Sequence, residues 1–145
     1  MTPDVNVLVA AFRRDHSHHV PASRWLANTL KATGPGGALR LLPPVVAGFL
    51  RLVTNPRVFQ QTDPIENAVA FIDALLNAPG VEMVVSGEEW PQFRQLCLDG
   101  KLQGNAIPDA WIAASVARQG DQLVTFDADF KKLLRREQLT LLAAT

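Results

Sequence analysis

Short apolar runs alternate with longer segments of helical periodicity along this chain, and this alternation restricts the possible folds more than any other feature. Strand-like runs are expected at residues 1–4, 38–42, 81–85, 122–126 and 139–142, and helices at 7–12, 20–32, 44–53, 64–77, 88–98, 107–119 and 128–135. Strands that alternate with helices require crossover connections, which favour parallel pairing with helices on both faces. The sequence therefore predicts a three-layer α/β/α domain with a mostly parallel central sheet.

The length and composition fit one such domain. The chain has 145 residues, of which 48% are hydrophobic and 19% charged, so it can bury a sizeable core. The clearest loop, Pro35-Gly36-Gly37, is too short to act as a linker between domains. We expect a single domain over residues 1–145.

The charge balance and the cysteine count exclude several classes of protein. Fourteen basic residues balance fourteen acidic ones, which argues against a polycationic nucleic-acid binder. The single Cys97 excludes an intrachain disulfide framework and a multi-cysteine zinc site. The apolar stretches are interrupted well before the roughly 20 residues of a membrane span, and the start lacks the basic region of a signal peptide. A cytoplasmic protein without a membrane segment is the expectation.

Acidic residues stand at several expected helix starts. Asp63, followed by Pro64 and Glu66, has the pattern of an N-cap that opens the helix over 64–77. Asp109 lies in an almost apolar stretch, either as the N-cap of a helix that begins at Ala110 or as a carboxylate that needs a compensating partner. Asp4 has the same two interpretations.

Taken together, Asp4, Asp109 and Asp127 predict a shared site. Asp4 and Asp127 stand where an expected strand meets an expected helix, and Asp109 stands at a helix start. In a parallel sheet such junctions share one edge, where ligand sites form. Two carboxylates ~4 Å apart would repel by about 4 kcal/mol at an effective dielectric near 20. A divalent cation relieves such repulsion, and oxygen ligands favour Mg²⁺ or Mn²⁺.

Four blocks of sequence resemble those of a PIN domain of the VapC toxin type. They are Pro3–Leu8 (PDVNVL), Val46–Phe59 (VAGFLRLVTNPRVF), Gly104–Ala114 (GNAIPDAWIAA) and Thr125–Phe130 (TFDADF). Their order and spacing, together with the length of the chain, agree with that family over nearly the entire sequence.

The resemblance implies a metal-dependent endoribonuclease that is the toxin of a toxin–antitoxin pair. The implied site residues are the metal-binding acids Asp4, Asp109 and Asp127, the further acid Asp129, and the hydrogen-bonding residues Asn6 and Thr125. Mg²⁺, or alternatively Mn²⁺, would orient and deprotonate a water that attacks an RNA phosphodiester. The implied partners are a VapB-like antitoxin and a second copy of the chain in a homodimer.

One position departs from the family pattern. The family normally carries a glutamate on the helix expected at 44–53, and this chain has Gly48 there. No shifted alignment restores the acid, because no Asp or Glu occurs between Asp15 and Asp63. A glycine within a helix costs about 1 kcal/mol relative to alanine. Our hypothesis is that Gly48 weakens or abolishes metal binding, as a natural or an inactivating change; the other interpretation is that it permits close helix packing.

Basic residues suggest where RNA would bind. Arg51 and Arg57 lie closest in sequence to the Gly48 motif and are the expected phosphate contacts. The basic run Lys131, Lys132, Arg135 and Arg136 is read either as a further phosphate contact or as a solvated helix face.

Two alternatives to the nuclease remain. The first is a catalytically degenerate PIN domain that binds RNA or an antitoxin, and position 48 distinguishes it from the enzyme. The second is a receiver-like signalling domain, which also gathers acids around Mg²⁺ at strand ends. It ranks lower because the expected first strand is followed by Asp4-Val5-Asn6 rather than by an acidic pair.

Overall fold

The computed structural model describes residues 1–32 and 39–143. The strands are β1 (Thr2–Pro3), β2 (Leu39–Leu41), β3 (Val81–Met83), β4 (Leu123–Thr125) and β5 (Leu139–Leu141); the α-helices are α1 (Val5–Phe12), α2 (His19–Lys31), α3 (Pro43–Val53), α4 (Ile65–Asn77), α5 (Trp90–Gly100) and α6 (Ala106–Arg118); the 3₁₀-helices are η1 (Ala128–Lys132) and η2 (Arg136–Gln138). The expected loop Pro35-Gly36-Gly37 lies outside the described residues.

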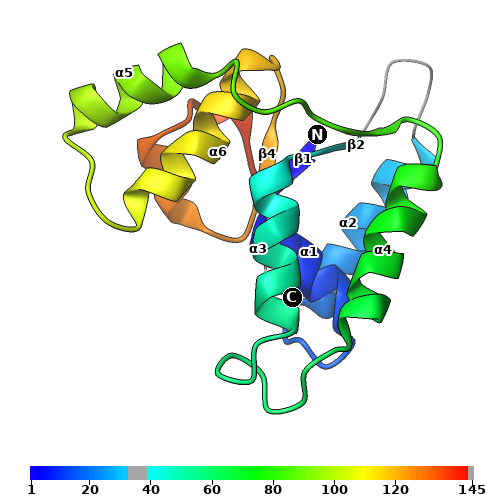
Figure 1. Cartoon of the computed structure of the whole chain (residues 1–145). Helices are drawn as coiled ribbons and strands as arrows, with labels where there is room; N and C mark the ends of the chain where they lie inside the picture. The colour runs from blue at the N-terminus through cyan, green and yellow to red at the C-terminus, as the bar shows by residue number, and fades with distance from the viewer. Residues whose placement is uncertain (33–38, 144–145) are drawn as a thin grey trace.

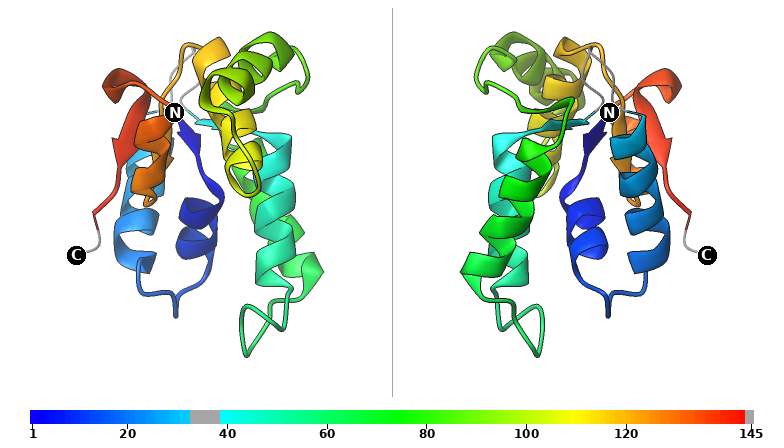
Figure 2. Two further views of the ribbon diagram at one scale, coloured as in Figure 1. Left: turned by 90° about the vertical axis from the view of Figure 1, so that its left-hand side faces the viewer. Right: turned by 90° about the vertical axis from the view of Figure 1, so that its right-hand side faces the viewer.

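The strands pair in parallel, as predicted. Strands β1, β4 and β5 form one ladder in the order β1-β4-β5, and β2 pairs with β3. The backbone N–H of Arg40 in β2 donates to the carbonyl of Met1 at 2.9 Å, which joins the two ladders at β1. With helices on both sides of these strands, the domain has the predicted three-layer α/β/α arrangement (Figures 1 and 2).

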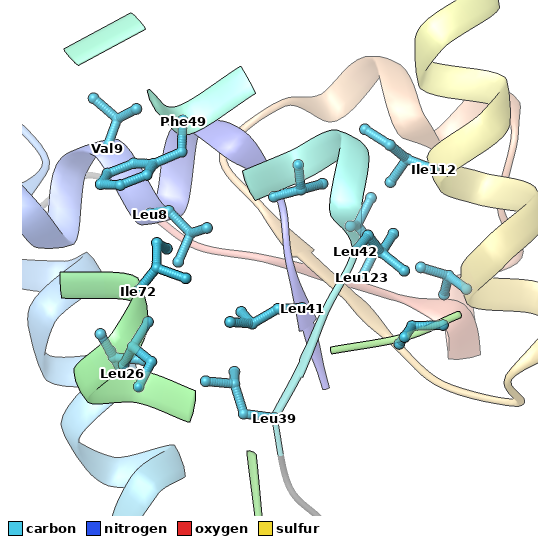
Figure 3. Packing of buried hydrophobic residues seen from close by; sticks show 14 of the residues in the cluster. Leu8, Val9, Leu26, Leu39, Leu41, Leu42, Phe49, Ile72, Ile112 and Leu123 are labelled. Atoms are coloured by element: carbon cyan, nitrogen blue, oxygen red, sulfur yellow. The ribbon is translucent and has the colours of Figure 1, made fainter. Parts of the chain in front are cut away.

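The core lies between the strands and the helices that cover them. Leu39 and Leu41 of β2 and Leu123 of β4 are fully buried, and they share one cluster with Phe49 of α3 and Ile72 of α4 (Figure 3). Side chains from distant parts of the sequence meet there, so apolar burial holds the helices against the strands. In the part of the chain that is described, no helix is long and apolar enough to cross a membrane.

The predicted cap at Asp63 is wrong. Helix α4 begins at Ile65, and Pro64 occupies the capping position with φ −59° and ψ 141°, without a side-chain hydrogen bond to the helix. The Asp63 carboxylate instead accepts a 2.8 Å hydrogen bond from Arg13 Nη1. The Asp63 carboxylate therefore pairs with the buried Arg13 and does not cap α4.

The predicted helix over 128–135 is also wrong. Residues Ala128–Lys132 form the 3₁₀-helix η1, and Arg136–Gln138 form η2. Asp127 caps η1, because its side chain accepts from the backbone N–H of Asp129 at 2.9 Å. The two short 3₁₀-helices connect β4 to β5, which starts at Leu139.

Candidate active site: an acidic cleft

Asp4 stands where β1 ends and α1 begins, and its two carboxylate oxygens have different partners. One oxygen accepts from the backbone N–H of Val5 at 2.7 Å, which caps α1. The other accepts from the hydroxyl of Thr125 at 2.7 Å. Asp4 is buried, and this burial raises its pKa although both hydrogen bonds act in the opposite direction. The capping interpretation is thus correct for Asp4, and it still leaves the carboxylate at the predicted edge.

Thr125, at the end of β4, connects three parts of the site. Besides donating to Asp4, its hydroxyl accepts from Asn6 Nδ2 at 3.2 Å and from the backbone N–H of Asp127 at 3.0 Å. Thr125 is fully buried, so these hydrogen bonds form away from competing water. The arrangement fixes Asp4 and Asn6 relative to the segment that carries Asp127.

Asp109 lies in the first turn of α6, so its predicted role as an N-cap is wrong. The helix begins at Ala106, three residues before Asp109 and ahead of the Ala110 start that the sequence suggested. Pro108 is accommodated because the first turn of a helix does not need its N–H. Asp109 is therefore the carboxylate that needs a compensating partner.

Asp109 interacts electrostatically with each of the other three predicted acids. The pKa of Asp109 is raised to about 6, mainly by burial and further by the neighbouring charges of Asp4, Asp127 and Asp129. The carboxylates of three segments that are far apart in the sequence therefore interact electrostatically. Mutual repulsion of this kind is the feature that a bound cation relieves.

A cleft of about 580 Å³ opens beside these acids. It is lined by Asp4, Val5, Asn6, Pro44, Gly48, Arg51, Leu52, Ser86, Pro108, Asp109, Trp111 and Ile112. The lining comes mainly from the start of α1, one side of α3 and the first turn of α6, with α3 and α6 beside each other in Figure 1. Arg51 is among the lining residues, but Arg57 is not.

Gly48 lies in this cleft, on α3, with no side chain to offer a ligand. A Cβ added at Gly48 would stand 3.0 Å from Cγ2 of Val5. The close-packing interpretation of Gly48 therefore fits the geometry, because Val5 of α1 occupies the space that a side chain on α3 would need.

The donors that are present suit a hard divalent cation. The four carboxylates and the amide and hydroxyl of Asn6 and Thr125 offer oxygen ligands only. Over residues 1–32 and 39–143, no three His, Cys, Asp or Glu side chains are already arranged to hold a metal ion. One oxygen of Asp4 and one of Asp127 are used by backbone N–H groups.

Glu89, which the sequence did not single out, is a buried carboxylate that contacts two residues of the cleft lining, Ser86 and Trp111. Its side chain accepts from the indole N–H of Trp111, from the hydroxyl of Ser86 at 3.2 Å and from the backbone N–H of Gly87 at 3.0 Å. Burial alone would raise the pKa of Glu89, but these hydrogen bonds, together with its own backbone N–H, lower it. Glu89 does not replace the acid missing at position 48, because its carboxylate oxygens accept hydrogen bonds from the 86–89 segment and from Trp111 of α6. No local pattern distinguishes it from the neighbouring, exposed Glu88.

The family model of the PIN domain matches residues 1–135 of this chain. A VapC ribonuclease of Mycobacterium bovis, Mb2897, is 38% identical over 133 residues, covering 91% of this chain and 88% of that protein. Ribonuclease VapC25 of Mycobacterium tuberculosis is 35% identical over 136 residues, covering 89% of each chain.

Solved structures agree in fold. The VapBC2 structure from Rickettsia felis, bound to a DNA fragment from its promoter, superposes with a TM-score of 0.65 at 17% identity and covers 98% of both chains. Mycobacterium tuberculosis VapC20, described as a sarcin-ricin loop cleaving toxin, gives a TM-score of 0.59 at 17% identity, covering 90% of this chain and 91% of that one. The chain therefore belongs to the PIN-domain family, among the VapC-type ribonuclease toxins of toxin–antitoxin systems.

Proposed function

We propose that this protein is a Mg²⁺-dependent endoribonuclease, for which Mn²⁺ can substitute, and that it is the toxin of a VapBC-type pair. The observation that carries the proposal is the cleft that Asp4 and Asp109 line together, with the Asp4 carboxylate held by the Thr125 hydroxyl at the end of the neighbouring strand. The pKa of Asp109, raised by burial and by the charges of Asp4, Asp127 and Asp129, supports it. The names of its relatives support ribonuclease activity at the level of the family.

The proposed roles follow from the contacts of each residue. Asp4, Asp109 and Asp127 would ligate the cation, with Asp129 as a further acid beside them. Thr125 would keep Asp4 ionised, because a hydrogen bond to a carboxylate stabilises its charged form. Asn6 would hold the Thr125 hydroxyl in this orientation. A bound divalent cation supplies Lewis-acid stabilisation of phosphoryl charge and lowers the pKa of water.

Arg51 is the better supported of the two proposed RNA contacts. It is exposed and lines the cleft that Asp4 and Asp109 also line, so an RNA phosphate in the cleft would meet its guanidinium. Arg57 is exposed in the segment after α3, where its backbone N–H donates to Asn55 Oδ1. A contact from Arg57 would therefore be to RNA that extends beyond the cleft.

The proposed partners are RNA, a VapB-like antitoxin and a second copy of the chain. The Rickettsia felis neighbour is a VapBC complex, which supports the antitoxin. Exposed apolar side chains on α2 (Val20) and α4 (Ile65, Val69) fit a helical interface, and Trp90 and Leu98 of α5 offer another. The homodimer stays a prediction.

The alternative function is a degenerate PIN domain that binds RNA or an antitoxin without cleavage. Gly48 favours it, because α3 contributes no acid to the cleft. The two functions differ in whether RNA is cut.

Cleavage of total RNA by the purified chain tests the proposal. With Mg²⁺ or Mn²⁺ the wild type should release fragments, and with a chelator it should release none. Asp4→Asn is the matched control, because asparagine still caps a helix and α1 should remain intact. RNA binding without cleavage at any divalent-ion concentration would establish the alternative, and equal cleavage by Asp4→Asn would refute the proposed site.

A further inference from the structure

Asp109 borders two separate hollows. The first is the cleft described above, where Arg51 is the cationic side chain. The second is smaller, about 200 Å³, and its polar lining consists of Asn105, Asp109, Asp129 and Lys132. Each of the two hollows therefore has one cationic side chain and at least one neutral hydrogen-bonding side chain. These neutral groups are Asn6 and Ser86 in the first hollow and Asn105 in the second.

Lys132 and its neighbour Lys131 line different hollows, although both are exposed. Lys132 lines the small hollow at Asp109, whereas Lys131 lines another one with Arg136 and apolar side chains of β5. Lys131 and Lys132 are consecutive in η1, so their side chains point about 120° apart. Only one of the two lysines therefore borders the hollow at Asp109.

Lys132 is also available for a ligand. Over the described residues it takes part in no ion pair, even though Asp109 and Asp129 line the same hollow. A site built from four carboxylates repels RNA phosphates, so productive binding needs cations on the path of the strand to either side of it. Arg51 provides such a cation in the first hollow but does not line the second.

We propose that Lys132, with Asn105, forms a second phosphate subsite, so that the RNA strand crosses Asp109 from the Arg51 cleft to the Lys132 hollow. The proposal rests on the proposed function and adds a residue that positions the substrate. The Lys132 ammonium would bind a backbone phosphate, and the Asn105 amide would donate to a phosphate or ribose oxygen. Because a backbone contact carries no base information, Lys132 should affect affinity for all sequences alike.

The test measures RNA affinity directly, by fluorescence anisotropy with an end-labelled single-stranded oligoribonucleotide in Mg²⁺. All proteins carry Asp4→Asn, so that the probe stays intact. Lys132→Ala should weaken binding about fivefold and reduce the slope of log affinity against log salt by about 0.7, the value for one contact to a single strand. Lys132→Arg should retain the affinity, and Lys131→Ala, the matched control, should change it less than twofold.

Several results would overturn the proposal. Equal effects of Lys132→Ala and Lys131→Ala would mean that only the overall charge matters. Unchanged RNA affinity with tighter Mn²⁺ binding in Lys132→Ala would make Lys132 an internal counter-charge for the acids, and lost antitoxin binding with unchanged RNA affinity would assign it to a protein partner. Metal-dependent cleavage by the wild type tests the proposed function separately, so cleavage with no Lys132 effect overturns this inference alone.

Discussion

The charge state of Asp109 is the most informative property at the scale of single residues. Its pKa of about 6 means that ionised Asp109 is less stable in the folded chain than in the unfolded one, where its ordinary value is 3.8. Without a cation, the folded protein therefore carries a penalty that is fully present above pH 6. The penalty decreases as the pH falls from 6 towards 3.8, because the folded state then takes up the proton first.

Replacing Asp109 by asparagine should accordingly stabilise the metal-free protein. At pH 8 with a chelator, we expect Asp109→Asn to raise the free energy of unfolding by about 1–2 kcal/mol, which is the shift in pKa discounted for partial exposure. The gain should vanish near pH 4. Urea denaturation at both pH values measures it, with exposed Asp73→Asn of α4 as the control. A destabilised Asp109→Asn at pH 8 would contradict the electrostatic account.

Gly48 and Val5 form a pair whose contact yields a second prediction. Gly48→Glu alone must displace the Val5 side chain, since the new Cβ would lie 3.0 Å from Cγ2. We expect the double variant Val5→Ala/Gly48→Glu to bind Mn²⁺ at least tenfold more tightly than the wild type, and the single variant to gain less. Calorimetric titration with Mn²⁺ measures both, with Val5→Ala as the control. No gain in the double variant would mean that the missing acid does not limit metal binding.

The sequence singles out individual residues of the proposed site but not the residues that contact them. Asp4, Asp109 and Asp127 are recognisable because each is an acid at a junction or in an apolar stretch, and Gly48 because it breaks a pattern. The contact of Gly48 with Val5 and the hydrogen bonds of Glu89 are made between segments distant in sequence. Such contacts depend on how helices pack, which no local pattern records.

At the scale of elements, Arg13 connects two segments that are distant in the sequence. It follows α1, its side chain is 7% exposed, and its guanidinium donates to Asp63 at 2.8 Å and to the carbonyl of Gln61 at 2.9 Å. The same group lies 3.8 Å from the centre of the Phe59 ring. Arg13 thereby ties the end of α1 to the segment between α3 and α4.

Removing this connection should destabilise the protein. We expect Arg13→Ala to lower the free energy of unfolding by about 2 kcal/mol, less than for a fully buried pair because Asp63 remains 27% exposed. Exposed Arg14→Ala, one residue further on, should change it by less than about 0.5 kcal/mol. Thermal or urea denaturation compares the two. Equal effects would show that the buried contacts of Arg13 are not what stabilises this part of the fold.

Element types were predictable where periodicity was long and regular. Helices α2, α4 and α6 and the five strands lie close to their expected ranges, because burial of one face imposes the pattern on the sequence. The segment 128–135 was predicted as one helix, whereas only Ala128–Lys132 is helical there, as the 3₁₀-helix η1, and η2 begins after the predicted range. The Asp63 cap failed because the competing partner, Arg13, is 50 residues away in the sequence.

At the scale of the whole molecule, the position of the site follows from parallel topology. Asp4 follows β1 and Asp127 follows β4, and these strands are neighbours, so their carboxyl ends meet at one edge. Helix α6 brings Asp109 to the cleft that Asp4 also lines. The order of elements predicts that Asp4 and Asp127 lie at one edge of the sheet, whereas the two hollows beside Asp109 depend on side-chain packing.

The central claim is that these carboxylates together hold a divalent cation, and Mn²⁺ binding to the purified chain tests it most directly. Electron paramagnetic resonance of free Mn²⁺ should reveal a site in the wild type whose affinity falls tenfold or more in Asp4→Asn and in Asp127→Asn. Asp73→Asn, on the exposed face of α4, should leave the affinity unchanged. Mn²⁺ affinity that is the same in all four proteins would contradict the account.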